Sequence, residues 1–157
     1  MNEIEMTTVP ARRNAREIAL HIIYERSFDV DNTEGILAGR LSEESFDALK
    51  EDIHVYENYL PAEECVYLRL LTSGVEAKRL ELAEIIRANS KNWRLERISR
   101  ISRAILEIAL YEILYMDAID TGVSINEAVE LAKKYDTEEA ASFINGVLGG
   151  YVRSSEE

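Results

Sequence analysis

Apolar side chains recur at steps of three and four residues along most of this chain, which is the periodicity of a helix with one apolar face. After Pro10, this spacing predicts a first helix over residues 11–26. A longer helix is expected over 61–89, where Gly74 allows a bend. The clearest apolar stripe predicts a further helix over 95–116.

Two helix-start signals follow towards the carboxyl end of the chain. Ser124 precedes Glu127 by three residues, and Asp136 precedes Glu139 by the same spacing. Because this spacing is that of a capping box, each pair predicts the first turn of a helix. The last of these helices is expected to end near 149–150, where two glycines stand together.

Two weaker helical patterns, at 33–41 and 42–53, complete the set. Seven glycines and two prolines in 157 residues leave little material for a turn-rich β protein. The sequence therefore predicts an all-α fold, a compact single-domain helical bundle of about six or seven helices over 1–157. Residues 1–9 and 152–157 are expected to be flexible.

The composition narrows the kind of site that can be expected. A single cysteine, Cys65, cannot form an internal disulfide, and two histidines cannot supply a metal-ligand cluster. We therefore expect no cofactor and no metal. No window approaches an uninterrupted membrane span, and the amino terminus lacks the layout of a signal peptide. A cytoplasmic protein that does not interact with membranes is predicted.

The formal net charge of −12 argues at first against a nucleic-acid partner. The charge is unevenly distributed, however. Segments 29–65 and 104–157 are strongly acidic, whereas 87–103 is basic. Because salt screens each charge beyond about 8–10 Å, a local basic patch on an acidic protein can still bind RNA.

Three arginines near the amino terminus form the first candidate patch. Arg12 and Arg16 are four residues apart and share a helical face, and Arg13 lies beside them. In the opening turns of a helix, cations oppose the helix dipole, which favours an anionic partner such as phosphate. A solvated first turn paired with Glu17 is the alternative, and the sequence leaves both interpretations open.

The second basic feature is a run of five cations, Lys91, Arg94, Arg97, Arg100 and Arg103. Steps of three drift by about 60° on a helix, so these side chains spread over half of its surface. A solvated charged face is the favoured interpretation. Arg94 and Arg97 flank the apolar stripe and are expected to make structural ion pairs. Arg100 and Arg103 point away from the stripe and could reach RNA.

Aromatic and carboxamide side chains give weaker signals. Tyr24, Tyr135 and Phe143 are candidate surfaces for stacking unpaired bases, although aromatic residues at helical spacing are usually core. Asn126 and Asn145 could bind RNA or a partner, but hydrogen bonding to a neighbouring loop carbonyl is the favoured role.

The acidic residues do not predict an enzyme. Glu127 and Glu130 share a helical face and could support a small hydrolase, but no serine, histidine or cysteine pairs with them convincingly. No glycine-rich phosphate loop is present either.

Several sequence blocks resemble the NusB antitermination-factor family in content and in spacing. They are Ala-Arg-Arg-Asn-Ala-Arg-Glu at 11–17, Ala-Ile-Leu-Glu-Ile-Ala-Leu-Tyr-Glu at 104–112, Ile-Asn-Glu-Ala-Val-Glu-Leu-Ala-Lys at 125–133 and Phe-Ile-Asn-Gly-Val-Leu at 143–148. The resemblance implies a helical, non-enzymatic factor that binds boxA RNA jointly with the small-subunit ribosomal protein NusE. The pair would act with other Nus factors and RNA polymerase over ribosomal RNA operons.

The resemblance also implies roles for individual residues. Arg12, Arg13 and Arg16 match the arginine-rich motif that contacts RNA, and Tyr24 and Phe143 match aromatic positions at the RNA-binding surface.

The chain departs from the family pattern at two positions. Glu107 stands where the family usually has arginine, and Asp136 where it usually has glycine. These departures keep open an alternative, a helical protein–protein adaptor whose RNA binding is weak or lost. A homodimer that hides the arginine face also stays open.

Overall fold

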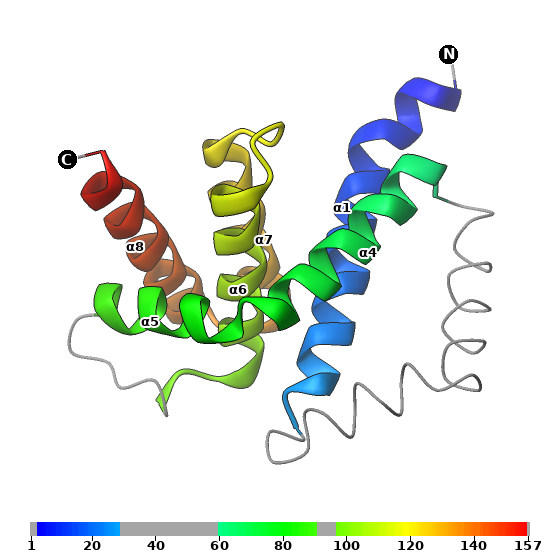
Figure 1. Cartoon of the computed structure of the whole chain (residues 1–157). Helices are drawn as coiled ribbons and strands as arrows, with labels where there is room; N and C mark the ends of the chain where they lie inside the picture. Colours follow the sequence, from blue (N-terminus) through cyan, green and yellow to red (C-terminus); the bar gives the residue numbers. More distant parts are fainter. Residues whose placement is uncertain (1–2, 29–59, 91–96, 157) are drawn as a thin grey trace. The chain divides into compact units, whose positions relative to one another are not determined.

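The computed structural model describes the backbone of residues 3–28, 60–90 and 97–156, with side chains from Ala11 onward in the first of these ranges. The two weak helical patterns predicted at 33–41 and 42–53 lie outside the described residues. Within the described part, the backbone forms helices and no strands (Figure 1). The helices are α1 (Glu3–Arg26), α4 (Ala62–Ala77), α5 (Arg79–Asn89), α6 (Arg100–Tyr115), α7 (Thr121–Tyr135) and α8 (Glu138–Ser155).

These helices confirm the predicted all-α fold. By its contacts the chain divides into two compact units, Met1–Leu70 and Leu71–Glu157. Helix α4 begins in the first unit and ends in the second. The predicted single domain, with flexible ends at 1–9 and 152–157, stays a prediction, although helical backbone covers much of both ends. No helix among the described residues has the length and apolar character needed to span a membrane.

The first unit contains α1 and the first turns of α4. Helix α1 begins at Glu3 and continues through Pro10, so the predicted start after this proline is wrong. A proline lacks one hydrogen-bond donor but has a helical φ, so a helix can continue through it at some cost in stability. The arginines that follow therefore lie well inside α1, and the argument that they oppose the positive end of the helix dipole does not apply.

The second unit is built around α6. Helix α7 packs against α6 and α8, and α5 packs against α6 and α8. Side chains from all four helices are fully enclosed in this core, and the largest are Leu82, Ile86, Ile105, Leu106, Leu110, Ile144 and Leu148. The apolar stripe predicted at 95–116 corresponds to α6, which begins at Arg100 because the Ser99 hydroxyl accepts a hydrogen bond of 3.1 Å from the backbone N–H of Ser102.

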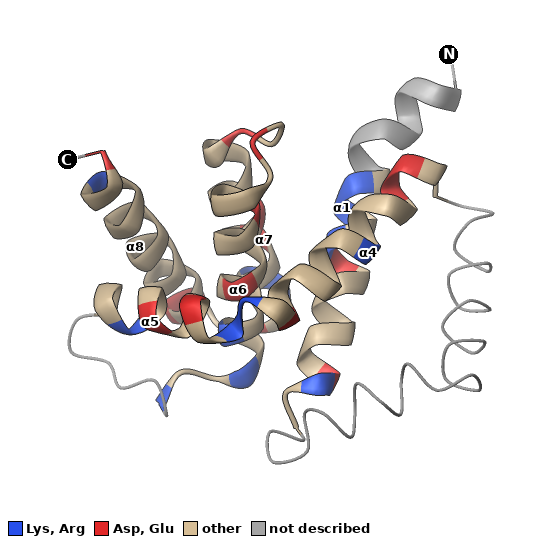
Figure 2. Ribbon diagram, viewed as in Figure 1, with Lys and Arg blue, Asp and Glu red and all other residues tan. Residues whose placement is uncertain are grey.

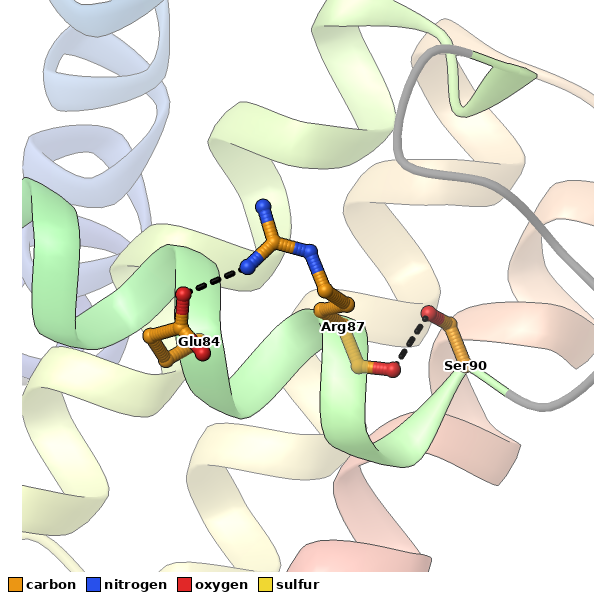
Figure 3. Close-up of polar contacts among 3 residues, drawn as sticks. All are labelled: Glu84, Arg87 and Ser90. Atoms are coloured by element: carbon orange, nitrogen blue, oxygen red, sulfur yellow. Dashed lines mark hydrogen bonds and ion pairs between the residues drawn. The ribbon is translucent and has the colours of Figure 1, made fainter.

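The single helix predicted over 61–89 is wrong, because α4 ends at Ala77 and α5 begins at Arg79. Ser90 is the C-cap of α5, and its hydroxyl donates a hydrogen bond to the Arg87 carbonyl over 3.4 Å. One turn earlier, the Arg87 guanidinium pairs with Glu84 on the solvent-exposed face (Figure 3).

The predicted cap of α7 is also wrong. Asp120 caps this helix by accepting a hydrogen bond of 2.8 Å from the Gly122 N–H. Ser124 lies one turn further on, where it is buried and donates its hydroxyl hydrogen to Glu112. Asp120 and Ser124 are both residue types that can cap a helix. Asp120 is the cap because the hydroxyl of Ser124 is bound to the buried carboxylate of Glu112 on α6.

Helix α8 begins one residue later than predicted. Thr137 is its cap and accepts a hydrogen bond of 3.0 Å from the Ala140 N–H, while Asp136 ends α7. Helix α8 also continues through the glycine pair at 149–150 and ends at Ser155. Two glycines in succession lower helix propensity, but the buried residues before them, Ala141, Ile144, Val147 and Leu148, anchor the helix in the core.

Candidate nucleic-acid interface

Arg12 lies at the contact between α1 and the first turns of α4. Its Nε donates to Oε2 of Glu64 in an ion pair, and its guanidinium lies 4.1 Å from the ring centroid of Tyr67. Figure 2 shows basic residues on this part of α1 beside acidic residues at the start of α4. The Arg12 side chain retains 30% of its exposure, against 7% for Glu64.

The other two arginines of the motif differ sharply in exposure. Arg16 is 4% exposed, with its guanidinium 5.8 Å from the centroid of the same Tyr67 ring. Arg13 is exposed on the surface of α1. The structure therefore places Arg13 at the surface, Arg12 partly at the surface and Arg16 inside the first unit.

Tyr24 lies near the end of α1 and is half-buried. Its ring meets Phe28 edge-on at a centroid distance of 4.8 Å, and Phe28 is 58% exposed. Phe28 was not among the residues predicted from the sequence, although a spacing of four residues between two aromatic side chains near a helix end is a usable signal. The first unit thus offers an aromatic pair as well as arginines.

Arg103 and Phe143 belong to the second unit, and both are half-buried. Phe143 lines a hollow of about 190 Å³, in which it is joined by residues around the α6 start and the α7–α8 turn. These residues are Arg97, Ile98, Ser99, Ser102, Asp136, Thr137, Glu139 and Ala140.

Asp136 gives this hollow an acidic wall. Its Oδ2 accepts hydrogen bonds from the hydroxyls of Ser99, over 2.6 Å, and Ser102, over 2.7 Å. The carboxylate therefore ties the first turn of α6 to the α7–α8 turn. Asp136 was expected to cap α8, and its place beside Phe143 was not predicted from the sequence.

The remaining basic run is mostly solvent-facing. Arg97 and Arg100 are exposed, in agreement with a solvated charged face, and Arg94 lies outside the described residues. The ion pair expected of Arg97 is wrong, because none involves it among the described residues. Glu107, the departure from the family pattern, is 6% exposed on the buried side of α6.

The two asparagines do not take the role that the sequence favoured. Among the described residues, no hydrogen bond involves the carboxamide of Asn126 or Asn145. Both are exposed and line a groove of about 470 Å³ between α7 and α8, whose floor includes Ile125, Val129 and Ala141.

The acids considered for a hydrolase lie in different surroundings. Glu127 is 7% exposed, whereas Glu130 is exposed and pairs with Lys133 over 3.6 Å. Among the described residues, no group of three or more histidine, cysteine or acidic side chains is arranged to hold a metal ion.

The fold is that of a small all-α protein that carries arginines and aromatic side chains along α1. Residues 13–153 match the model of the NusB family. The chain belongs to the NusB family, as the sequence blocks predicted.

Two relatives carry the same description, transcription antitermination protein NusB. The chain is 35% identical over 138 residues to that of Clostridium botulinum strain Kyoto, covering 88% of this chain and 96% of the relative. It is 37% identical over 138 residues to that of Natranaerobius thermophilus, covering 88% and 91%.

Solved structures give the same fold. NusB of T. maritima superposes with a TM-score of 0.69 at 26% identity, covering 90% of both chains. A chain from a crystal structure of the antitermination factors NusB and NusE with double-stranded RNA gives a TM-score of 0.71 at 22% identity, covering 92% of this chain and 98% of that one.

Proposed function

We propose that this chain is a transcription antitermination factor that binds boxA-type single-stranded RNA together with NusE. In this role it supports processive transcription of ribosomal RNA operons and meets other Nus factors and RNA polymerase indirectly. The observation that carries the proposal is the similarity, over 88% of the chain, to antitermination proteins of the NusB family. The structure of NusB and NusE in complex with double-stranded RNA supports NusE and RNA as partners, while the single-stranded form of the RNA is part of the proposal.

The proposed role requires binding and no chemical step, and it takes place in the cytoplasm, on nascent RNA. Exposed Arg13 and the partly exposed Arg12 supply positive charge on α1. Tyr24 and Phe28 in the first unit, and Phe143 in the second, supply rings on which unpaired bases can stack. Arg103 on α6 adds a cation near the start of that helix.

A titration with fluorescein-labelled boxA-type RNA, with and without NusE and at two salt concentrations, tests the proposal. Phosphate-dominated binding must weaken with salt, with a slope of roughly −0.7 per phosphate neutralised on a single strand. Arg13→Ala should weaken binding and reduce this slope, and Arg87→Ala, an exposed arginine on α5, serves as the matched control.

Two results would count against RNA binding. Recovery of NusE without any RNA contribution to the complex would favour the adaptor alternative. Equal RNA affinity of Arg13→Ala and the parent would show that the exposed arginine of α1 does not contribute to RNA binding. Light scattering at the same concentrations reports whether a homodimer forms and competes with RNA.

A further inference from the structure

The guanidinium of Arg12 is fixed from two directions by residues of α4. The Glu64 carboxylate holds Nε at the inner edge, and the Tyr67 ring lies against the guanidinium 4.1 Å away. Both residues come from the first turns of α4, and both are at least nine-tenths buried. Arg12 is therefore held by parts of the fold that do not rearrange easily.

The outer edge of the same guanidinium is open. Among the described residues, no hydrogen bond or ion pair involves Nη1 or Nη2 of Arg12, and neither atom is among the buried side-chain atoms that lack a partner. With 30% of the side chain exposed, these two nitrogens form the accessible end of the group. Two parallel N–H donors at a fixed spacing are the fork that binds a phosphate through two hydrogen bonds.

We propose that Glu64 and Tyr67 are positioning residues that hold Arg12 ready for a two-pronged contact with one phosphate of single-stranded RNA. This inference rests on the proposed function. A free arginine loses rotamer freedom when it binds, whereas this one has been ordered by folding, so its contact costs less on binding. Glu64 engages only Nε and so leaves the outer edge of the guanidinium to the phosphate.

If Glu64 acted only through its negative charge, its removal would have the opposite effect on RNA binding from the one expected of a positioning residue. An acid beside an RNA-binding arginine lowers the local positive potential, so its removal should strengthen RNA binding. Under the positioning role, removal of Glu64 releases Arg12 and weakens binding. The neighbouring Glu63 is exposed and forms no side-chain hydrogen bond or ion pair with another described residue, which makes it the matched control for charge alone.

The experiment titrates the full chain with fluorescein-labelled boxA-type single-stranded RNA at two salt concentrations. The variants are Glu64→Gln, Glu63→Gln, Arg12→Ala and the double variant Glu64→Gln with Arg12→Ala. We expect Glu63→Gln to bind as tightly as the parent or more tightly. Glu64→Gln should bind roughly 3- to 10-fold more weakly, and Arg12→Ala by about 10-fold or more with a salt slope reduced by about 0.7.

The double variant separates positioning from an independent contribution. If Glu64 acts only through Arg12, Glu64→Gln has no further effect once Arg12 is alanine. A second readout is the Nε–H resonance of Arg12 in a nitrogen-15 correlation spectrum of the RNA-free protein. We expect this resonance in the parent and in Tyr67→Phe, which keeps the ring, and its loss by exchange broadening in Glu64→Gln. Circular dichroism and thermal melting confirm that each variant is folded.

Several outcomes overturn the inference. Unchanged or tighter RNA binding by a folded Glu64→Gln variant, while the parent binds in a salt-dependent manner, removes the positioning role and leaves the proposed function intact. Additive losses in the double variant do the same. If the parent itself does not bind the RNA, the proposed function fails, and the phosphate contact fails with it.

Discussion

The Ser124 hydroxyl donates a hydrogen bond of 2.8 Å to Oε1 of Glu112, and the two residues are only 2% and 1% exposed. The bond joins the second turn of α7 to α6 in the core of the second unit. A carboxylate without contact to water needs hydrogen-bond donors to offset its lost hydration. Ser124 therefore stabilises the packing of α7 on α6 and does not begin the helix.

Replacement of Ser124 by alanine should lower the free energy of unfolding by about 1.5–3 kcal/mol, because a buried carboxylate loses a donor. Urea denaturation followed by circular dichroism measures this change, with an unchanged dependence on denaturant concentration. Ser142→Ala, at an exposed position on α8, is the control. Identical midpoints for the parent and Ser124→Ala would contradict the role given to this hydrogen bond.

Gly74 in α4 makes room for Tyr111 of α6. A Cβ at this position would overlap the Tyr111 ring and hydroxyl, so we expect Gly74→Ala to destabilise the protein although alanine is the better helix former. In a Tyr111→Leu background the overlap disappears, and the same change should be neutral or stabilising by up to about 1 kcal/mol. A double-mutant cycle of thermal melts checks the reversal, and equal effects in both backgrounds would refute it.

Local periodicity predicted α6, α7 and α8 of the second unit, because an apolar stripe such as that of α6 is a property of consecutive residues. The ends of the helices were predicted less well. Near α7 the sequence offers both Asp120 and Ser124 as caps, and only the position of Glu112 on another helix decides between them. The break between α4 and α5 likewise has no strong local signal, because the residues at the break, Ala77 and Lys78, are both compatible with a continuous helix.

The candidate site depends even more on contacts between distant residues. Arg12 and Glu64 are 52 positions apart, so nothing in either segment alone predicts their ion pair. The burial of Arg16 has no signal in the motif itself, because Arg12 and Arg16 each follow a buried alanine and only Arg16 is enclosed. The sequence could identify the arginine motif, but only the fold of α4 on α1 separates the exposed arginine from the enclosed one.

Tyr115 should lose its phenolic proton at a higher pH than an ordinary tyrosine, because its pKa is raised. Its hydroxyl donates to the Glu81 carboxylate at 2.6 and 2.8 Å, and this hydrogen bond is the main reason that the pKa of Tyr115 is raised from 10.0 to about 12. A raised pKa in the folded state gives a stabilising contribution that is complete below pH 10 and is lost as the pH rises through about 12. Absorbance of the phenolate at alkaline pH measures the titration. Glu81→Gln should return the pKa of Tyr115 towards 10, and an unaltered curve in that variant would rule out Glu81 as the cause.

Asp136 should affect stability and RNA binding in opposite directions. Its carboxylate accepts hydrogen bonds from Ser99 and Ser102 and lines the hollow that contains Phe143, where an RNA phosphate would be repelled. Asp136→Asn keeps an acceptor for the hydroxyls but removes the charge. We expect a loss of stability of about 0.5–1.5 kcal/mol, because a neutral acceptor binds hydroxyls less strongly. We also expect roughly two- to fivefold tighter RNA binding at low salt, an advantage that disappears at high salt because screening removes the repulsion.

Parallel melts and RNA titrations of Asp136→Asn and of Glu130→Gln, an exposed acid on α7, check both directions. Weaker RNA binding by a folded Asp136→Asn variant would instead make this carboxylate a direct acceptor for RNA.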